Sequence, residues 1–450
     1  MTCKSSILRI ESFYSTYLDN KRDIYVYLPP GYSYEKSKRY PVLYMHDGQN
    51  IFHPAFNGYS WHVDQTVDRL IHEHKIEEII VVGIPNMGME RSNEYTHDLE
   101  GVLYPLDKVT IQPKGQLYEK FIIEEVMIYV DSVFRTKTGP EHTALLGSSR
   151  GGQVTYHIGL RRPDIFGMLA IVSPYFYCVD PMSSEEIRLY HSFTTKQPLS
   201  RIWIDLGSAE GTLVLEKHTR AVTEELVALG YEADTQLIYF NDPGAAHAEK
   251  DWAARLSSPL IYFFGSKGEA SSISLIGCEE VGIMGPTSRL NPILEFGDDF
   301  KMTLLRAAYH VEDQEIMDVL ENGTLVPKKE GVTSVTVKYE DLEAMIEIRV
   351  ISQQKEYVTL DMVVHVPPDS PADMKLYAWF PLLHDSSSGT YYNRLQVPLH
   401  AEFIYQISRQ DGIVEADSAG ESVQHKYVAL EDATVEIYVE HWMRNEASKN

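Results

Sequence analysis

The 450-residue sequence predicts a mostly parallel β-sheet with helices on both faces, followed by two small all-β sandwich units. Three observations predict this organisation. Short apolar runs alternate with helix-like stretches as far as residue 265, a small polar segment follows, and beyond it apolar residues recur with period two. We therefore expect an α/β unit over residues 1–265, a linker at 266–272, and β-sandwich units over 273–353 and 354–450.

The first unit contains five short runs that are apolar on both faces, as strands covered by helices on both sides are. These runs lie at 41–47, 78–86, 143–149, 168–174 and 201–208. Helices are expected at 61–74, 116–134, 151–163, 215–230 and 251–265. Ahead of the first run, polar and apolar residues alternate at 7–15 and 22–32, which indicates an antiparallel hairpin at the start of the sheet.

After residue 272 the sequence consists of short strand-like runs separated by turn-forming residues. The runs lie at 301–310, 333–340, 343–351, 357–367, 375–381, 402–409 and 434–442. Turn residues separate them at 321–323, 368–371 and 411–412. Even spacing of short strands between turns is typical of β sandwiches.

The charge balance restricts the possible partners. The chain has 40 Lys and Arg against 65 Asp and Glu, a net charge of −25, and 31 of the acidic residues lie after residue 265. Nucleic acid and anionic membranes would repel such a surface, so we expect neither as a partner. The N-terminus lacks the apolar core of a signal peptide, and three widely spaced cysteines allow no disulfide framework. A reduced, cytoplasmic protein is therefore expected.

The strongest chemical signal is the pentapeptide Gly-Ser-Ser-Arg-Gly at 147–151, a G-x-S-x-G motif. It follows the apolar run that begins at Thr143 and precedes a helical stretch, which is the strand–turn–helix context of a nucleophile elbow. Such a turn exposes the central hydroxyl at the edge of the sheet. Ser149 is therefore the predicted nucleophile.

A serine hydroxyl becomes a nucleophile only when a base takes its proton and an acid orients that base. His247 is the predicted base, because it lies in a Gly- and Ala-rich loop before the closing helix. The nearer His157 lies on the helix of the elbow and is expected to pack there. Glu210, just past the end of a strand, is the predicted acid, with Asp205 and Asp242 as alternatives.

The negative oxygen that forms during acyl transfer needs backbone N–H donors. One donor is expected at Arg150, the residue after the nucleophile. The other is expected at Gln49 or Asn50, in the loop after the first buried strand. The spacing of the histidines in this region matches no compact ligand pattern, so neither a metal nor a cofactor is expected. These histidines are His46, His53 and His62.

Together these motifs resemble the putative esterase family of α/β-hydrolases. The resemblance rests on 43–52, 61–70, 79–86, 91–96, 145–152, 207–210 and 247–252, in family order. The family includes feruloyl and acetyl-xylan esterases, enterochelin esterases, S-formylglutathione hydrolases and mycolyltransferases. The resemblance implies an α/β-hydrolase fold for 1–265, with Ser149 as nucleophile, Glu210 as acid and His247 as base. Residues 305–350 resemble a bacterial Ig-like domain, and 354–445 resemble a degraded starch-binding-like β-sandwich.

The predicted function is that of a serine carboxylic-ester hydrolase that works through an acyl-enzyme. The expected substrate is a small-molecule or oligosaccharide ester, such as a feruloyl or acetyl ester of an oligosaccharide or a siderophore ester. The β units offer surfaces for association into a homo-oligomer. The alternative function is that of a hydrolase domain that has lost its activity and serves, with its β modules, as a binding scaffold.

Overall fold

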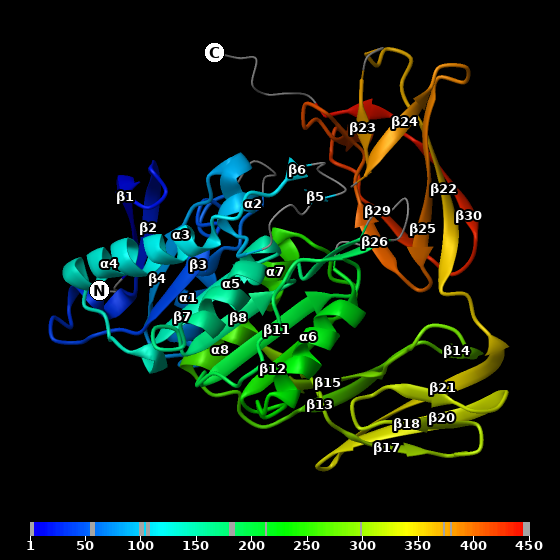
Figure 1. The fold of residues 1–450 in the computed structure, drawn as a ribbon, viewed down its shortest axis with the longest axis horizontal. Helices are drawn as coiled ribbons and strands as arrows, with labels where there is room; N and C mark the ends of the chain where they lie inside the picture. Colours follow the sequence, from blue (N-terminus) through cyan, green and yellow to red (C-terminus); the bar gives the residue numbers. More distant parts are fainter. Residues whose placement is uncertain are drawn as a thin grey trace.

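The computed structural model describes residues 4–54, 59–98, 103–104, 109–179, 185–211, 214–297, 299–371, 374–378 and 380–443. In these residues an eleven-stranded sheet flanked by helices lies beside two β modules, one coloured yellow and the other orange to red in Figure 1. The first part is an α/β unit and the second is rich in β structure, as the sequence predicts.

Six parallel strands form the centre of the large sheet, with antiparallel strands at both of its edges. In sheet order the strands are β1 (Ser6–Ser15), β2 (Asn20–Leu28), β4 (Ile80–Ile84), β3 (Val42–His46), β7 (Thr143–Ser148), β8 (Met168–Val172), β11 (Arg201–Gly207), β12 (Leu237–Asp242), β16 (Phe300–Thr303), β15 (Asn291–Phe296) and β13 (Ser272–Ile276). The predicted hairpin β1–β2 and the five predicted parallel strands are confirmed. The sixth parallel strand, β12, lies where no strand is predicted.

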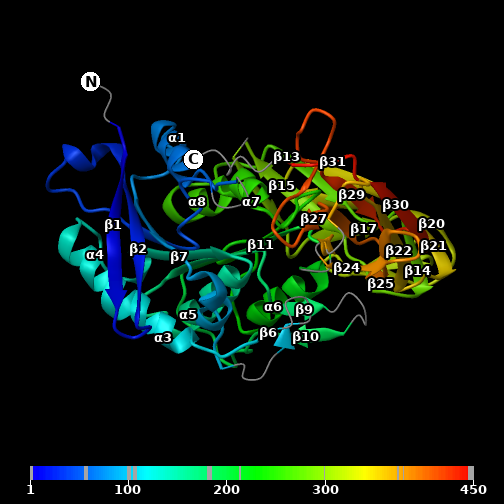
Figure 2. The same cartoon turned by 90° about the horizontal axis from the view of Figure 1, so that it is seen from above.

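Helices cover both faces of this sheet, as Figure 2 shows from above. One face packs against α1 (Val63–His72), α7 (Glu249–Arg255) and α8 (Ser257–Phe264). The other packs against α5 (Arg150–Arg161), α6 (Glu216–Ala228) and a continuous helical segment made of α3 (Gly115–Lys120), a π-helix (Phe121–Met127) and α4 (Ile128–Val133). Because the strand side chains alternate between two buried clusters, these strands are apolar on both faces.

The expected end of the α/β unit at residue 265 is wrong. Strand β16 pairs with β12 through Tyr239 and Thr303, and β15 and β13 extend the same sheet further. Leu294, Phe300 and Met302 are buried in the same cluster as α8. Residues 266–272 therefore connect α8 to the last edge of the same sheet rather than linking two units. Period-two alternation predicts a strand but not the sheet that the strand joins.

The middle module begins at β14 and not at residue 273. Its four-stranded sheet contains β14 (Glu280–Met284), β21 (Leu342–Gln353), β20 (Gly331–Tyr339) and β17 (Ala308–Val311), and the hairpin β18 (Met317–Val319) and β19 (Leu325–Pro327) packs on it. The predicted turn between the hairpin strands is confirmed, since Gly323 has φ of 83°, a conformation that glycine adopts readily.

The third module has its own apolar core, formed by buried residues between Val358 and Val439. Its six-stranded sheet contains β27 (Ser408–Arg409), β23 (Leu376–Tyr377), β24 (Pro381–Asp385), β25 (Thr390–Pro398), β22 (Tyr357–His365) and β30 (Ala433–Tyr438). Two further pairs are β26 (Glu402–Tyr405) with β29 (His425–Val428), and β28 (Glu415–Ala416) with β31 (His441–Trp442). These strands fall within the unit predicted over 354–450.

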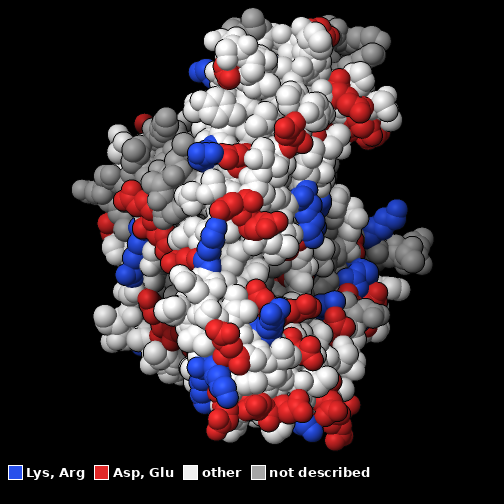
Figure 3. Space-filling view, turned by 90° about the vertical axis from the view of Figure 1, so that its right-hand side faces the viewer, with Lys and Arg blue, Asp and Glu red and all other residues white. Residues whose placement is uncertain are grey.

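Short elements connect the larger ones. They are α2 (Arg91–Glu94), β5 (Leu103–Tyr104), β6 (Val109–Thr110), β9 (Tyr177–Val179), β10 (Glu186–Arg188) and single-turn 3₁₀ helices at Pro30–Ser33, Gly88–Glu90 and Pro140–His142. Among the described helices, none is long and apolar enough to cross a bilayer. Figure 3 shows acidic side chains gathered along the lower edge of the face that it views.

A chain that ends at Gly265 is expected to be insoluble, because it lacks the three strands that cover the edge of β12. Each of the lost buried side chains contributes about 1.5–3 kcal/mol, and the sum approaches the whole stability of a typical domain. Soluble yield and circular dichroism measure the effect. A chain that ends at Arg306 is the control, since it keeps all eleven strands and should fold. A soluble, folded chain of residues 1–265 would contradict the assignment of these strands to the hydrolase core.

Candidate active site

Ser149 lies on a tight turn between β7 and α5. Its backbone has φ of 59° and ψ of −124°, which a residue with a side chain adopts only under strain. Gly147 makes the turn possible, because a Cβ atom there would lie 2.5 Å from the carbonyl oxygen of Gly151. Arg150 is the first residue of α5, at the positive end of the helix dipole. The strand, turn and helix predicted from the sequence are therefore all present.

Glu210 and His247 form a hydrogen-bonded pair at the same edge of the sheet. Glu210 follows β11 and His247 follows β12, and His247 Nδ1 lies 2.7 Å from Glu210 Oε2. The Glu210 side chain is fully buried, whereas 14% of the His247 side chain is exposed. Burial by itself raises the pKa of Glu210, but the charge and hydrogen bond of His247, with help from Arg255, keep that pKa below its ordinary value.

The two alternative acids contact an arginine instead of His247. Asp205 lies inside β11, where its Oδ1 accepts a hydrogen bond of 2.9 Å from Arg255 Nε and its Oδ2 accepts one from Trp203. Asp242 Oδ2 lies 3.8 Å from Arg255 Nη1. The carboxylate that contacts the His247 imidazole is thus that of Glu210, in the loop after β11.

Ser173 connects the elbow to this pair. It directly follows β8, and its hydroxyl donates a hydrogen bond of 2.6 Å to Glu210 Oε1 while accepting others from Trp252 and Arg255. On the elbow side, the Ser149 N–H donates to the carbonyl of Val172, the residue before Ser173. A network of buried hydrogen bonds therefore fixes Glu210 relative to β8, the strand that pairs with β7 before the elbow.

The rings of Trp252 and His247 meet at nearly a right angle, with ring centroids 5.1 Å apart. Trp252 also packs against Trp61, at a centroid distance of 5.5 Å. These aromatic contacts restrict the orientation of the imidazole, whose Nδ1 is already held by Glu210.

The loop after β3, which carries the predicted second N–H donor, is fixed by an ion pair. Arg91 donates two hydrogen bonds of 2.7 Å to the carboxylate of Asp47, and Asn86 donates a third. Burial alone would raise the pKa of Asp47, but Arg91 lowers it below its ordinary value. Asn50 donates its backbone N–H to the Asp47 carbonyl, whereas among the described residues the Gln49 N–H has no acceptor.

The remaining histidines near the elbow have other partners. His46 is buried, and its Nδ1 lies 2.9 Å from the hydroxyl oxygen of Tyr118. Burial lowers the pKa of His46 to about 3. His157 packs in the interior as predicted, where its Nε2 accepts a hydrogen bond from the His191 N–H. Within the described ranges, no three His, Cys, Asp or Glu side chains are grouped closely enough to bind a metal ion.

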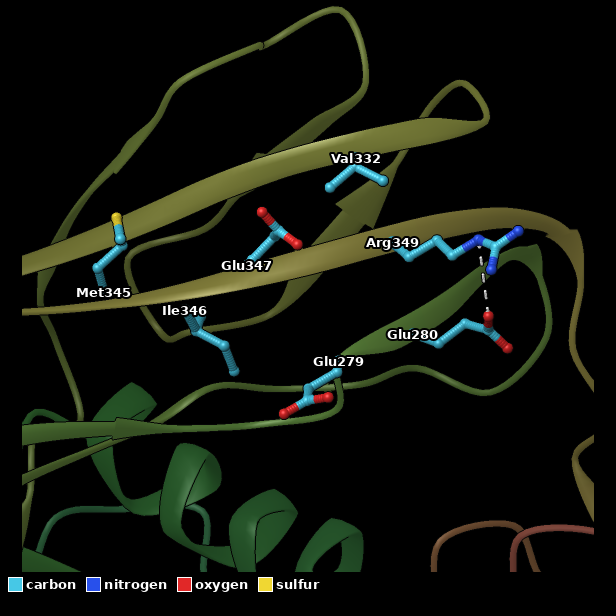
Figure 4. Close-up of a pocket in the computed structure, with 7 residues that line it drawn as sticks. All are labelled: Glu279, Glu280, Val332, Met345, Ile346, Glu347 and Arg349. Atoms are coloured by element: carbon cyan, nitrogen blue, oxygen red, sulfur yellow. Dashed lines mark ion pairs between the residues drawn. The ribbon is translucent and has the colours of Figure 1, made fainter.

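Two cavities differ in their chemistry. One of about 170 Å³ lies beside the pair and is lined by Glu210 and His247 together with residues of the third module. The other, of about 620 Å³, is an open hollow in the middle module (Figure 4). Figure 4 shows Glu279, Glu280 and Arg349 around it, and its described lining contains no nucleophile with a base. Of the two, the smaller cavity is the one that touches the candidate acid and base, and Ser149 is not among its described lining residues.

Comparison with known protein families gives a match to the first part of the chain. The model of the family described as "Putative esterase" matches residues 15–263, more than half of the chain. The chain belongs to the putative esterase family. This esterase is accordingly a carboxylic ester hydrolase with an α/β-hydrolase fold in its first part.

Relatives of this esterase align over about half of the chain. It is 28% identical over 248 residues to an endo-1,4-beta-xylanase/feruloyl esterase of Xylanibacter ruminicola, an alignment that covers 54% of this chain and 29% of the relative. It is 24% identical over 247 residues to the uncharacterized protein YbbA of Bacillus subtilis, covering 53% of this chain and 91% of the relative.

Two esterases are among the solved structures to which the chain is similar. One is a ferulic acid esterase of Anaeromyces mucronatus in complex with ferulic acid, with a TM-score of 0.43, 23% identity, and coverage of 58% of this chain and 89% of that one. The other is the enterobactin esterase of Shigella flexneri, with a TM-score of 0.44, 17% identity, and coverage of 57% and 59%.

Replacing Asp242 by asparagine is expected to reduce the loss of stability of this esterase between pH 5 and pH 7. Burial raises the pKa of Asp242 from 3.8 to about 6. The protonated carboxyl group therefore stabilises the folded state at low pH, and that contribution is lost as the pH rises through about 6. Of the difference between the two pKa values, about one unit lies above pH 5, so at about 1.4 kcal/mol per unit the loss between pH 5 and pH 7 is on the order of 1 kcal/mol. Urea unfolding of both chains at each pH measures it, and equal pH dependence in the two chains would contradict it.

Proposed function

We propose that this esterase cleaves its substrate with Ser149 as nucleophile, His247 as general base and Glu210 as the acid that orients the histidine. The observation that carries the proposal is the 2.7 Å contact of His247 Nδ1 with a fully buried carboxylate. It leaves Nε2 as the nitrogen that takes a proton. The strained elbow after β7, at the same edge of the sheet, and the Ser173 network further support it.

The reaction follows from these roles. The Ser149 oxygen attacks the ester carbonyl carbon as its proton passes to His247 Nε2, and the tetrahedral intermediate collapses when the bond to the alcohol oxygen breaks. The proton on His247 then goes to that oxygen, and the alcohol leaves. A water molecule, deprotonated by His247, then attacks the acyl carbon. The bond from that carbon to the Ser149 oxygen breaks, the proton on His247 returns to the Ser149 oxygen, and the acid leaves. No cofactor takes part.

The N–H groups of Arg150 and Gln49 are proposed to stabilise the negative oxygen of both intermediates. Arg150 lies at the start of α5, and the ion pair of Asp47 with Arg91 fixes the loop that carries Gln49. Of the two residues predicted in that loop, Gln49 is preferred because the Asn50 N–H already donates to Asp47. Fixed donors stabilise a developing charge without the cost of reorienting water.

The substrate is proposed to be a feruloyl or acetyl ester of an oligosaccharide. One relative of this esterase is named a xylanase/feruloyl esterase. The siderophore ester is the other substrate class predicted from the sequence. The resemblances of the two β modules to Ig-like and starch-binding-like domains, their association into a homo-oligomer and the cytoplasmic location stay predictions.

Hydrolysis of a panel of esters by the purified chain tests the proposal. The panel contains p-nitrophenyl acetate, a feruloyl ester, an acetylated sugar and a siderophore trilactone, compared by kcat/KM. We expect turnover of the aryl ester and a preference for the sugar or feruloyl esters. A folded chain that hydrolyses none of them would favour the alternative, a domain that has lost its activity and serves as a scaffold.

A further inference from the structure

The third module touches the loop that carries the catalytic acid. Strand β26 forms a bridge to it, in which Phe403 pairs with Glu210 and the Gly211 N–H donates a hydrogen bond of 3.0 Å to the carbonyl of Glu402. Ser208 in the same loop donates to the Glu402 side chain. Figure 1 shows β26 and β29 at the end of the third module that faces the α/β unit. A strand distant in sequence thus extends the edge of the active-site loop.

The contact is close and apolar at its centre. The Phe403 side chain is buried, and its ring lies so near Gly211 that a Cβ atom there would be 2.5 Å from the ring. Gly211 has φ of 68°, so glycine suits this position both by conformation and by space. Strand β26 is therefore packed against the acid loop and not merely beside it.

The cavity of about 170 Å³ lies between the acid and base loops of the α/β unit and the third module. Ala246, His247 and Ala248 form one side of it, and Phe403, Ile404 and Gln424 of the third module form the other. At its rim the Lys250 ammonium donates a hydrogen bond of 2.8 Å to the Gln424 side chain. Both of these rim side chains are exposed, and each carries hydrogen-bonding groups.

We propose that this cavity binds the alcohol part of the ester and that the third module supplies one wall of it. The proposal rests on the proposed function, because a histidine that gives its proton to the leaving oxygen must have the alcohol beside it. Lys250 and Gln424 face that alcohol with an ammonium and an amide, which suit an alcohol that carries several hydroxyl groups. Ile404 contributes the apolar surface on which the alcohol lies.

The test compares two acetate esters that differ only in their alcohol. Both form the same acetyl-enzyme, so a difference in kcat/KM reports acylation, the step in which the alcohol is bound. The full chain and its Lys250→Ala and Gln424→Ala variants are assayed with an acetylated xylose and with p-nitrophenyl acetate. The measured quantity is the kcat/KM for the acetylated xylose divided by the kcat/KM for p-nitrophenyl acetate. Loss of one hydrogen bond to the sugar should lower this ratio about five- to tenfold.

Lys355→Ala is the matched control, because Lys355 is an exposed lysine of the third module that pairs with Asp432 and does not line the cavity. It should keep the wild-type ratio. An unchanged ratio in both cavity variants, or a wild-type chain that hydrolyses the aryl ester but not the sugar ester, would overturn the proposal. Failure of the proposed function looks different, since the wild-type chain would then hydrolyse neither ester.

Discussion

Replacement of Ser149 by alanine is expected to lower kcat for ester hydrolysis about 10⁴- to 10⁶-fold while the fold stays intact. The loss follows from the chemistry, because without the hydroxyl no acyl-enzyme forms and only the N–H donors and substrate binding remain. The exchange removes one oxygen from a half-buried side chain, so little packing is lost. Initial rates with p-nitrophenyl acetate at saturating substrate measure the effect.

Ser132→Ala is the control for this variant, since Ser132 is a serine on α4 whose hydroxyl donates to the carbonyl of Tyr129 in its own helix. It should keep wild-type activity. Circular dichroism and Tm should agree among the three chains. If the folded Ser149→Ala chain retained more than about a tenth of the wild-type activity, another residue would be the nucleophile.

Glu210→Gln is expected to lower kcat about 10³- to 10⁴-fold, and Asp205→Asn much less. A glutamine can turn its amide N–H₂ toward His247 Nδ1, which favours the tautomer whose Nε2 carries a proton and cannot act as the base. Asp205 contacts Arg255 and Trp203 instead. Its replacement removes the carboxylate nearest to the buried Arg255, which costs about 3–5 kcal/mol of stability but does not change the tautomer of the histidine.

The two effects are separated by measuring kcat and the free energy of unfolding for each variant. Glu210→Gln should change mainly kcat, and Asp205→Asn mainly the free energy of unfolding. Both are measured at a temperature at which circular dichroism shows a folded chain. The reverse ranking of kcat values in folded chains would assign the acid to Asp205.

Much of the α/β unit could be predicted from the sequence because its signals are local. An apolar run flanked by turn residues predicts a strand such as β7, and glycines around Ser149 predict the elbow. Glu210 could be predicted as the acid because it follows a strand of the parallel sheet, and His247 as the base because it lies in a Gly- and Ala-rich loop, although the strand before that loop, β12, was not predicted. The structure places the two side chains in contact.

The remainder depends on contacts between distant parts of the chain. Ser173 and Arg255 hold Glu210 in place, yet nothing in the local pattern distinguishes them from other residues of a turn and a helix. Strands β15 and β16 alternate like those of the modules that follow, so their place in the hydrolase sheet was not predictable from period alone. The contact of β26 with Gly211 likewise joins residues nearly 200 positions apart.

Trapping of the acyl-enzyme tests the central claim most directly. The full chain is mixed with p-nitrophenyl acetate, quenched in acid within the first turnovers, digested and examined by mass spectrometry. We expect one acetyl group per chain, on the peptide that contains Ser149, and none in the Ser149→Ala variant. A stable acetyl adduct on another residue, or rapid turnover with no adduct at Ser149 under any quench time, would contradict the proposed nucleophile.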